Sequence, residues 1–561
     1  MFRPKSMQKT IFDHDVYLPK ERLAALEKTW AGPFRHKVLP LIDEEPFRPF
    51  YHPETGRPNV PVATLICLCV LKELHNLTDR EVLGSLAFDL RWQYALDLNA
   101  VEAPVCQKTL HTFRTLVATN GKAREIFSSL TGGIIEAAGL STDTQRLDST
   151  HITSNMANLS RLALFVRTIE TFVWNLERRH SELSGKLPRL YGKVYRERAG
   201  YFADVKSSRA RRRLGKVAGH LFFLVDRFRG HPEITKLKSY RLMARVLEEQ
   251  CHVESGDGGR VSLKGPGEIP ADSLQNPSDP DATYGRKGKG YKVSLTETCV
   301  AENPVQVITD VSVAGAHTSD QNDVPAVIAR LDEAGRKPVA LVADAGYGSG
   351  ENIVDAAERA VTLTAPITSG APVNPEKMQL SDFTTTADGT RVLSCIKGHT
   401  PISCKPAGGG KAVAAIFGKA HCSDCELLPI CLVKRRKGGA YRLRYKLAQM
   451  ATSRRREEQE TTDFKERYKI RSGIEATISE ADRVTGLKRV WTRGKDRVSM
   501  VVYLKALAIN VKRYIHRELE KATTAFLCHV PTHIRTRMRS FLLWNPSCRE
   551  DFPSAGRPIA A

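Results

Sequence analysis

Three acidic residues stand where predicted segments of regular structure begin or end. Asp148 lies in Gln-Arg-Leu-Asp-Ser-Thr, Asp344 follows the apolar run Val-Ala-Leu-Val-Ala, and Glu475 opens a helical pattern rich in Arg and Lys. Carboxylates at the tips of separate segments can converge on a divalent metal ion, and Mg²⁺ prefers such oxygen ligands. The pattern therefore indicates a metal site built from distant parts of the chain.

The charge balance indicates which substrate such a site would act on. The chain of 561 residues carries 85 Lys and Arg against 62 Asp and Glu, a formal net charge of +23. An excess of this size attracts polyanions over long range, so we expect DNA as the partner and a phosphodiester as the substrate. The alternative is a solvated basic surface. Hydrophobic and charged contents of 41% and 26% are ordinary for a soluble globular protein.

Metal-assisted phosphodiester chemistry needs few protein ligands. Two divalent ions about 4 Å apart can activate the attacking oxygen and stabilise the leaving oxygen. Asp148 between two Mg²⁺ (or Mn²⁺) ions, with Asp344 on one ion and Glu475 on the other, would suit this arrangement. Each acid alone also has a structural interpretation, as a turn, a loop cap or a complement to the helix macrodipole. Three further acids are alternative ligands: Asp143, Asp310 and Glu480.

The first 125 residues are predicted to be helical. Thr78 and Glu81 have the spacing of a capping box before a helix. Two more short helices are predicted over 90–96 and 107–118, and three helices in this order are typical of a helix-turn-helix. The exposed face would then carry three basic residues: Lys108, His111 and Arg114. A helical domain without DNA contacts, or a dimerisation surface, fits the same pattern.

The middle of the chain predicts a mixed α/β sheet flanked by helices. Apolar residues over 162–176 follow the 3.6-residue period of an amphipathic helix, whereas 255–290 has the Gly, Pro and Asp content of a long loop. Further helices are expected over 324–334 and 353–359. The expected strands cover 144–153, 291–298, 305–313, 338–343 and 361–365.

Several segments together resemble a known family. The stretches 146–150 and 343–347 surround the two aspartates, and Tyr468 and Arg471 precede Glu475 with the spacing of a Tyr-Arg-Glu signature. The chain resembles the bacterial insertion-sequence transposases of the DDE class, which have a helical N-terminal domain and a ribonuclease-H-like catalytic domain. The stretches 77–96 and 276–282 are similar to the same family.

The resemblance implies both an activity and a site. Asp148, Asp344 and Glu475 would be the catalytic metal ligands. Tyr468 and Arg471 would contact DNA phosphate. The implied reaction is hydrolysis at the ends of a mobile DNA element, followed by attack of the exposed 3′-hydroxyls on target DNA. Two ends must be held together, so a homodimer on DNA is expected.

One position departs from the family signature. The signature often has Lys seven residues after the glutamate, where this chain has Asp482. The expected replacement for its phosphate contact is one of three residues: Arg483, Lys488 or Arg489. Arg493 extends this basic stretch, in which phosphate contact is favoured over a merely solvated face. Trp491 is expected either to stack on an unpaired base or to lie in the core.

Five of the twelve cysteines cluster between the second aspartate and the glutamate. They are Cys395, Cys404, Cys422, Cys425 and Cys431. Cys422 and Cys425 form a close pair suited to tetrahedral Zn²⁺, and two of the other three would complete a structural site. Because the chain has no second close pair here, reduced thiols and a conditional disulfide are the alternatives.

The motifs also give domain boundaries. The expected units are a helical domain over 1–125, a catalytic domain assembled from 141–155, 288–368 and 446–520, a helical insertion over 156–287, a Cys-bearing insertion over 369–445, and a tail over 521–561. The stretch 284–290 lacks the spacing of a nucleotide-binding loop, so no ATP is expected. No apolar run reaches the roughly 20 residues that span a bilayer, and a cytoplasmic protein without membrane contact is expected.

Two other functions fit the same residues. A domesticated nuclease or recombinase would cut DNA without integrating it. A DNA-binding regulator would use the N-terminal helices, and its acidic residues would be merely structural. Replacing Asp344 by Asn separates the regulator from both enzymes, because a pure DNA binder would keep its full activity.

Overall fold

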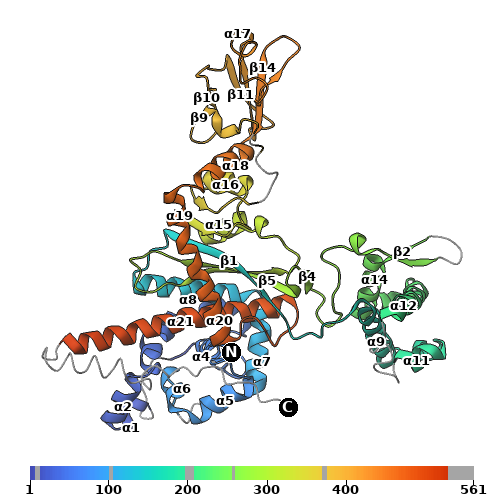
Figure 1. The fold of residues 1–561 in the computed structure, drawn as a ribbon. Helices are drawn as coiled ribbons and strands as arrows, with labels where there is room; N and C mark the ends of the chain where they lie inside the picture. Colours follow the sequence, from blue (N-terminus) through green and yellow to red (C-terminus); the bar gives the residue numbers. More distant parts are fainter. Residues whose placement is uncertain are drawn as a thin grey trace.

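A central sheet joins the parts of the chain (Figure 1). The computed structural model describes residues 1–6, 13–99, 105–195, 207–254, 260–368, 374 and 376–528. In Figure 1 the N-terminal helices lie below the sheet, a helical arm projects to one side and a small β-domain stands at the top. Within the described residues no helix is both long and apolar enough to cross a bilayer. Most of the predicted tail, from residue 529 onward, lies outside those residues.

The sheet is mixed, as expected, with strands in the order β6-β5-β1-β7-β8. β5 is antiparallel to both β1 and β6, whereas β7 runs parallel to β1 and β8 runs parallel to β7. The short strand β4 pairs with the start of β5. The strands are β1 (Thr144–Ile152), β4 (Thr283–Gly285), β5 (Gly288–Thr298), β6 (Ile308–Gly315), β7 (Ala340–Ala343) and β8 (Thr362–Thr364). The five predicted strands are confirmed, with some ends shifted by a few residues.

Helices cover both faces of this sheet. On one face, Ile152 and Val293 share a hydrophobic core with the N-terminal helices and with α20 and α21. On the other face, Leu147 and Leu363 pack with α15 and α16. Successive residues of a strand point to opposite faces, so β1 contributes to both cores. The covering helices are α15 (Val324–Glu333), α16 (Gly350–Glu358), α20 (Gly473–Thr485) and α21 (Lys495–Cys528).

The N-terminal region is helical, as predicted, and α4 is its buried centre. Thr78 and Glu81 form the predicted capping box of α5. Arg114 pairs with Asp79 at 2.5 Å, so the prediction that Arg114 lies on an exposed basic face is wrong. The helices of this region include α2 (Lys20–Glu27), α4 (Val62–Leu74), α5 (Asp79–Phe88), α6 (Leu90–Ala95), α7 (Gln107–Thr119) and α8 (Lys122–Ala138).

The helical insertion forms the arm and has a hydrophobic core of its own. The predicted amphipathic helix is α9, which packs against α12 and α14. The interpretation of 255–290 as one loop is wrong in part, because β3 and β4 lie within it; residues 255–259 are outside the described ranges. The arm comprises α9 (Arg161–Arg179), α10 (Ser181–Gly185), α11 (Arg189–Tyr195), α12 (Ser207–Phe228), α13 (Pro232–Thr235), α14 (Lys238–Gln250), β2 (Cys251–Val253) and β3 (Val261–Leu263).

The Cys-bearing insertion folds as the β-domain around a separate core. Its main sheet has the order β11-β12-β14-β13, and each pair of neighbouring strands is antiparallel. The chain then returns through α18 and α19 to α20 (Figure 1). The segments are β9 (Thr384–Thr385), β10 (Val392–Ser394), β11 (Ser403–Ala407), β12 (Ala412–Phe417), α17 (Lys419–Cys422), β13 (Lys434–Arg435), β14 (Tyr441–Lys446), α18 (Leu447–Glu458) and α19 (Thr462–Lys469).

A buried ion pair joins the N-terminal helices to α21. Glu73 of α4 lies 2.7 Å from the Nζ of Lys505 in α21 and 3.1 Å from the Nζ of Lys72. Both Glu73 and Lys505 are buried. Burial by itself raises the pKa of Glu73, but the charges of Lys505 and Lys72 outweigh this effect and lower the pKa to about 2.

We expect Glu73→Gln to lower the free energy of unfolding by about 3–5 kcal/mol, because the Lys505 ammonium stays buried without its anion. Urea unfolding measures this change. In the wild type, the lowered pKa of Glu73 contributes to the free energy of unfolding. This contribution is fully present above pH 4.5, the ordinary pKa of a glutamate, and is lost as the pH falls through about 2. Glu125→Gln, which removes the more exposed partner of Lys122, should cost less than about 1 kcal/mol. Equal losses in the two variants would contradict the prediction.

Candidate active site

The two predicted aspartates lie at the same edge of the sheet. Asp148 is in β1, Asp344 directly follows β7, and these strands are parallel neighbours. The register pairs Leu147 with Ala343, so the aspartates are the next residues along each strand. In open α/β sheets this carboxyl edge is where side chains from different segments meet a ligand.

Arg471 joins the first aspartate to the predicted glutamate. Its Nη2 donates to Asp148 Oδ2 at 2.9 Å, and its Nη1 donates to Glu475 Oε1 at 2.7 Å. Asp148 is buried, and burial is the main cause that raises its pKa; the charge of Asp344 raises it too, while that of Arg471 lowers it. Glu475, in the first turn of α20, is exposed. One guanidinium therefore stands where carboxylates from two distant segments converge.

Tyr468 faces the same place from α19. Burial raises the pKa of its hydroxyl, and the charge of Arg471 lowers it. Three carboxylates raise this pKa further: Asp344, Asp148 and Glu475. Because the interaction between charges falls off with distance, all three carboxylates lie in the neighbourhood of the Tyr468 hydroxyl. The printed contacts thus link Asp148 and Glu475 through Arg471, and the strand register sets Asp344 beside Asp148.

The carboxylate oxygens of Asp148, Asp344 and Glu475 are suitable ligands for a hard divalent ion. They do not converge on one point in this structure. Among the described residues, no three His, Cys, Asp or Glu side chains are gathered as a metal site. The Arg471 guanidinium lies between Asp148 and Glu475 and supplies the positive charge that pairs with both carboxylates. Carboxylate oxygens are the ligands that Mg²⁺ prefers, and a cation already stabilises two of them here. The oxygen donors of the three acids are therefore of the kind that Mg²⁺ takes, and the Arg471 guanidinium lies between two of them.

The three alternative acids are engaged elsewhere. Asp310 of β6 forms a bidentate pair with Arg330 of α15, at 2.7 Å for the shortest contact. Glu480 pairs with two cations of α21. Asp143 lies before the first residue of β1, at the opposite end of the strand from the site, and accepts a hydrogen bond from a serine hydroxyl. Their positions favour structural roles.

A fourth acid near the site was not predicted. A Cβ atom at Gly346 would lie 2.9 Å from Asp344 Oδ1 and 3.5 Å from Asp320 Oδ2, so the two carboxylates approach the same glycine. Lys292 of β5 lies 3.2 Å from Asp320. In the sequence Asp320 has only the signal of a helix start, and Ser319 does cap the short helix there. The fold alone brings Asp320 beside Asp344.

The predicted basic residues lie on the last turn of α20 and on the loop after it. Arg483, Lys488, Arg489 and Arg493 are all exposed. Backbone hydrogen bonds from this loop to Thr153 hold it against the end of β1. The Arg489 guanidinium lies 5.5 Å from the ring centre of Trp491, which is 69% exposed. The alternative in which Trp491 belongs to the core is therefore wrong.

Asp482 stabilises this loop at the position where the signature has lysine. Its Oδ1 accepts a hydrogen bond from the Lys488 backbone amide at 2.9 Å, and its Oδ2 lies 3.7 Å from Lys488 Nζ. The Lys488 ammonium therefore lies next to position 482 of α20.

Four of the five clustered cysteines line one cavity in the β-domain, although their sulfur atoms are not gathered closely enough to form a metal site. Cys395, Cys422, Cys425 and Cys431 line a cavity of about 30 Å³ together with His399 and His421. Cys404 does not line it; its Sγ lies on β11 and accepts from the backbone amide of Val392 at 3.4 Å. Burial is the main cause that raises the pKa of Cys422, followed by the charges of the other three thiols of the cavity. The cavity is thus lined by the close pair together with Cys395 and Cys431, two of the three further ligands that the sequence offered.

Two parts of the chain match models of protein families. Residues 24–116 match a family described as Transposase domain (DUF772), and residues 394–515 match the Transposase DDE domain. The first match covers the helices from α2 to α7, and the second runs from the β-domain through Glu475 into α21. No curated protein and no solved structure gives a match.

Both matching families are described as transposase domains. In these two regions the chain is similar to transposases, with an N-terminal transposase domain and a catalytic DDE domain. The family resemblance of the sequence is confirmed at this level. That its mobile element is a bacterial insertion sequence stays a prediction.

Proposed function

We propose that this transposase cuts the ends of its insertion sequence and joins them to target DNA, with Asp148, Asp344 and Glu475 as ligands of two Mg²⁺ or Mn²⁺ ions. The main support is that Asp148 and Asp344 lie side by side at one edge of two parallel strands. Arg471 ties Glu475 to the same place. Metal ions held there would activate the attacking oxygen and stabilise the leaving oxygen of the phosphodiester.

A ribonuclease-H-like catalytic domain is part of this proposal. Three antiparallel strands followed by two parallel ones, in the order β6-β5-β1-β7-β8, support it, as do the helices on both faces. The domain would consist of 141–155, 288–368 and 446–520. The arm and the β-domain would then be insertions at two of its connections.

The cations of the chain would hold the DNA. Tyr468 and Arg471 would bind the scissile phosphate, and Lys488 would replace the lysine of the family signature. Arg483, Arg489 and Arg493 would contact neighbouring phosphates, and the exposed Trp491 would stack on an unpaired base. The attacking groups are water during cleavage and a DNA 3′-hydroxyl during joining, so no covalent protein–DNA bond forms. Two DNA ends would engage two active sites in a homodimer.

A strand-transfer assay tests this function. The substrate is a labelled duplex that ends in the sequence bordering the gene in its mobile element, mixed with a plasmid target and Mg²⁺. We expect labelled 3′ ends to become joined to the plasmid. Cleavage without joining would instead support a nuclease, and binding without cleavage would support a regulator.

The β-domain would hold a structural Zn²⁺ on Cys395, Cys422, Cys425 and Cys431. Support comes from the four thiols that line one small cavity and from the close spacing of Cys422 and Cys425. Thiolates are the usual ligands of structural zinc, and a closed set of four leaves no position for catalysis. This zinc is separate from the ions of the active site.

We expect the purified protein to contain one zinc ion per chain, as measured by elemental analysis after purification without chelators. Cys422→Ser and Cys425→Ser should each lose the zinc and lower the thermal midpoint, because metal binding contributes to folding. Cys404→Ser is the matched control and should keep both. Zinc-free wild type, or equal loss in the Cys404→Ser variant, would rule out the proposed site.

A further inference from the structure

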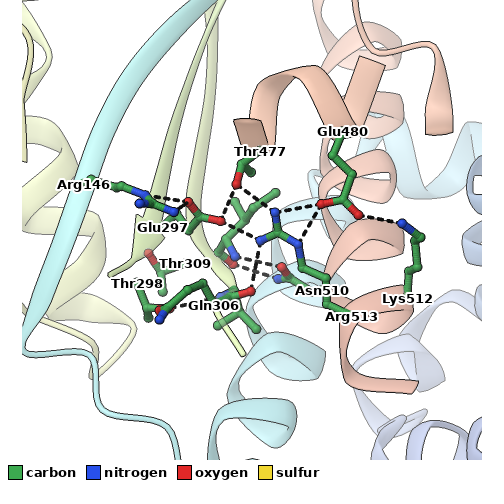
Figure 2. Close-up of polar contacts among 12 residues, drawn as sticks. Arg146, Glu297, Thr298, Gln306, Thr309, Thr477, Glu480, Asn510, Lys512 and Arg513 are labelled. Carbon is green, nitrogen blue, oxygen red and sulfur yellow. Dashed lines mark hydrogen bonds and ion pairs between the residues drawn. The ribbon is translucent and has the colours of Figure 1, made fainter. Parts of the chain in front are cut away.

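A buried carboxylate behind the active site bonds to three segments. Glu297 of β5 is fully buried and lies directly opposite Arg146 of β1 in the register. Its Oε2 lies 2.7 Å from Arg146 Nη2. Its Oε1 lies 2.5 Å from Arg513 Nη1 of α21 and 2.5 Å from the Thr477 hydroxyl of α20, as Figure 2 shows. One side chain thus connects β1, α20 and α21.

Arg146 extends this connection to the first turn of α20. It lies two residues before Asp148 in β1, so both side chains are on the same face of the sheet. Its Nη1 donates to the backbone carbonyl of Ile470 at 2.9 Å. Gly473, the first residue of α20, packs so closely on it that a Cβ atom would overlap the guanidinium. The guanidinium cannot move away without losing its contacts to Oε2 of the buried Glu297.

Gly473 is needed for space and not for its backbone conformation. Its φ of −62° and ψ of −24° are helical values that any residue adopts. Alanine would suit this backbone and would by itself favour the helix. A loss caused by Gly473→Ala would therefore come from its contact with Arg146.

Arg513 of α21 contacts the later turns of α20, at Thr477 and Glu480. Its Nη2 lies 2.8 Å from Glu480 Oε2, and Lys512 Nζ lies 2.6 Å from Glu480 Oε1 (Figure 2). Burying several charges in this way brings little stability compared with apolar packing of the same volume. Directed ion pairs do fix geometry, and here they fix the rotation and height of α20 against β1.

We propose that Glu297, Arg146 and Arg513 are positioning residues that hold α20 so that Glu475 faces Asp148. The inference rests on the proposed function, in which both acids are metal ligands. Glu475 follows Gly473 by two residues, within the turn that Arg146 contacts. A displacement of about 1 Å in such a turn is enough to slow a reaction by about 100-fold.

The Gly473→Ala variant tests the contact with Arg146. DNA cleavage should slow by about 100-fold, and Mn²⁺ binding measured without DNA should weaken. Gly84→Ala makes the same change in α5, where nothing lies within 4 Å of the added Cβ, and should change neither. In an Arg146→Ala background, Gly473→Ala should have no further effect. Wild-type cleavage and Mn²⁺ binding by the Gly473→Ala variant would overturn the proposal.

Amide hydrogen exchange over 473–485, measured without metal or DNA, separates this inference from the proposed function. Glu297→Gln should speed exchange in α20 well beyond the change in overall stability. Asp310→Asn breaks a buried ion pair on β6 and is the matched control; it should leave α20 unchanged. Unchanged exchange in the Glu297→Gln variant would overturn the positioning role. If the wild type does not cleave DNA, the proposed function is overturned. The hydrogen-exchange result then decides by itself whether Glu297 positions α20.

Discussion

Asp148→Asn, Asp344→Asn and Glu475→Gln are each expected to slow strand cleavage by at least about 1,000-fold, which corresponds to about 4 kcal/mol in the barrier. Each change keeps the size of the side chain and removes the negative charge that a divalent ion requires. Because the folded sheet and the basic surface stay, DNA binding should persist. Cleavage rates and fluorescence anisotropy on the same labelled duplex measure the two effects.

Two further variants show whether the loss is specific to these carboxylates. Asp143→Asn changes an exposed acid at the opposite end of the strand that carries Asp148, and should cleave at the wild-type rate. Asp320→Asn examines the acid that approaches Asp344. If Asp344→Asn still cleaves and Asp320→Asn does not, Asp320 is the ligand and Asp344 is misassigned. Survival of cleavage in any one of the three main variants removes that residue from the site.

Arg471→Gln is expected to change metal binding and DNA cleavage in opposite directions. The change removes the cation between Asp148 and Glu475, so Mn²⁺ should bind the DNA-free protein at least about threefold more tightly. Cleavage should fall by about 100-fold, because the proposed phosphate contact is lost. Electron paramagnetic resonance of free Mn²⁺ and the cleavage assay give the two values.

Arg467→Gln is the charge-matched control for this experiment. Arg467 lies one helical turn before Arg471, in α19, and pairs with Glu458 and Asp463. Both Mn²⁺ affinity and cleavage should be unaffected in this variant. Weaker Mn²⁺ binding by Arg471→Gln would show that its guanidinium does not compete with the metal. Normal cleavage by that variant would refute the phosphate contact.

Much of the fold could be predicted because its signals are local. The alternation of apolar residues identified β5 and β6, the apolar run before Asp344 identified β7, and the 3.6-residue period identified α9. The capping box at Thr78 was also correct, since it depends on residues three positions apart. The interpretation of 255–290 failed in part because its Gly and Pro residues signal turns, and here such turns join short paired strands: β3 pairs with β2, and β4 pairs with the start of β5.

Contacts between distant residues explain one further error and decide two points that the sequence left open. Arg114 has the helical spacing of an exposed residue, but Asp79 of a neighbouring helix occupies its guanidinium. Cys404 lies close in sequence to the other clustered cysteines, but a strand directs it away from their cavity. Trp491 sits in a mixed stretch whose burial depends on what packs against it, and it is exposed.

The sequence by itself determined the helices and strands, the three candidate carboxylates and the transposase family, because periodicity, capping and motif spacing act within short segments. Tertiary structure decided which of these segments meet. The register of β1 with β7 brings Asp148 beside Asp344, and the register of β1 with β5 buries Glu297 against Arg146. These contacts depend on strand pairing across long separations in the chain, where no local pattern specifies the partner.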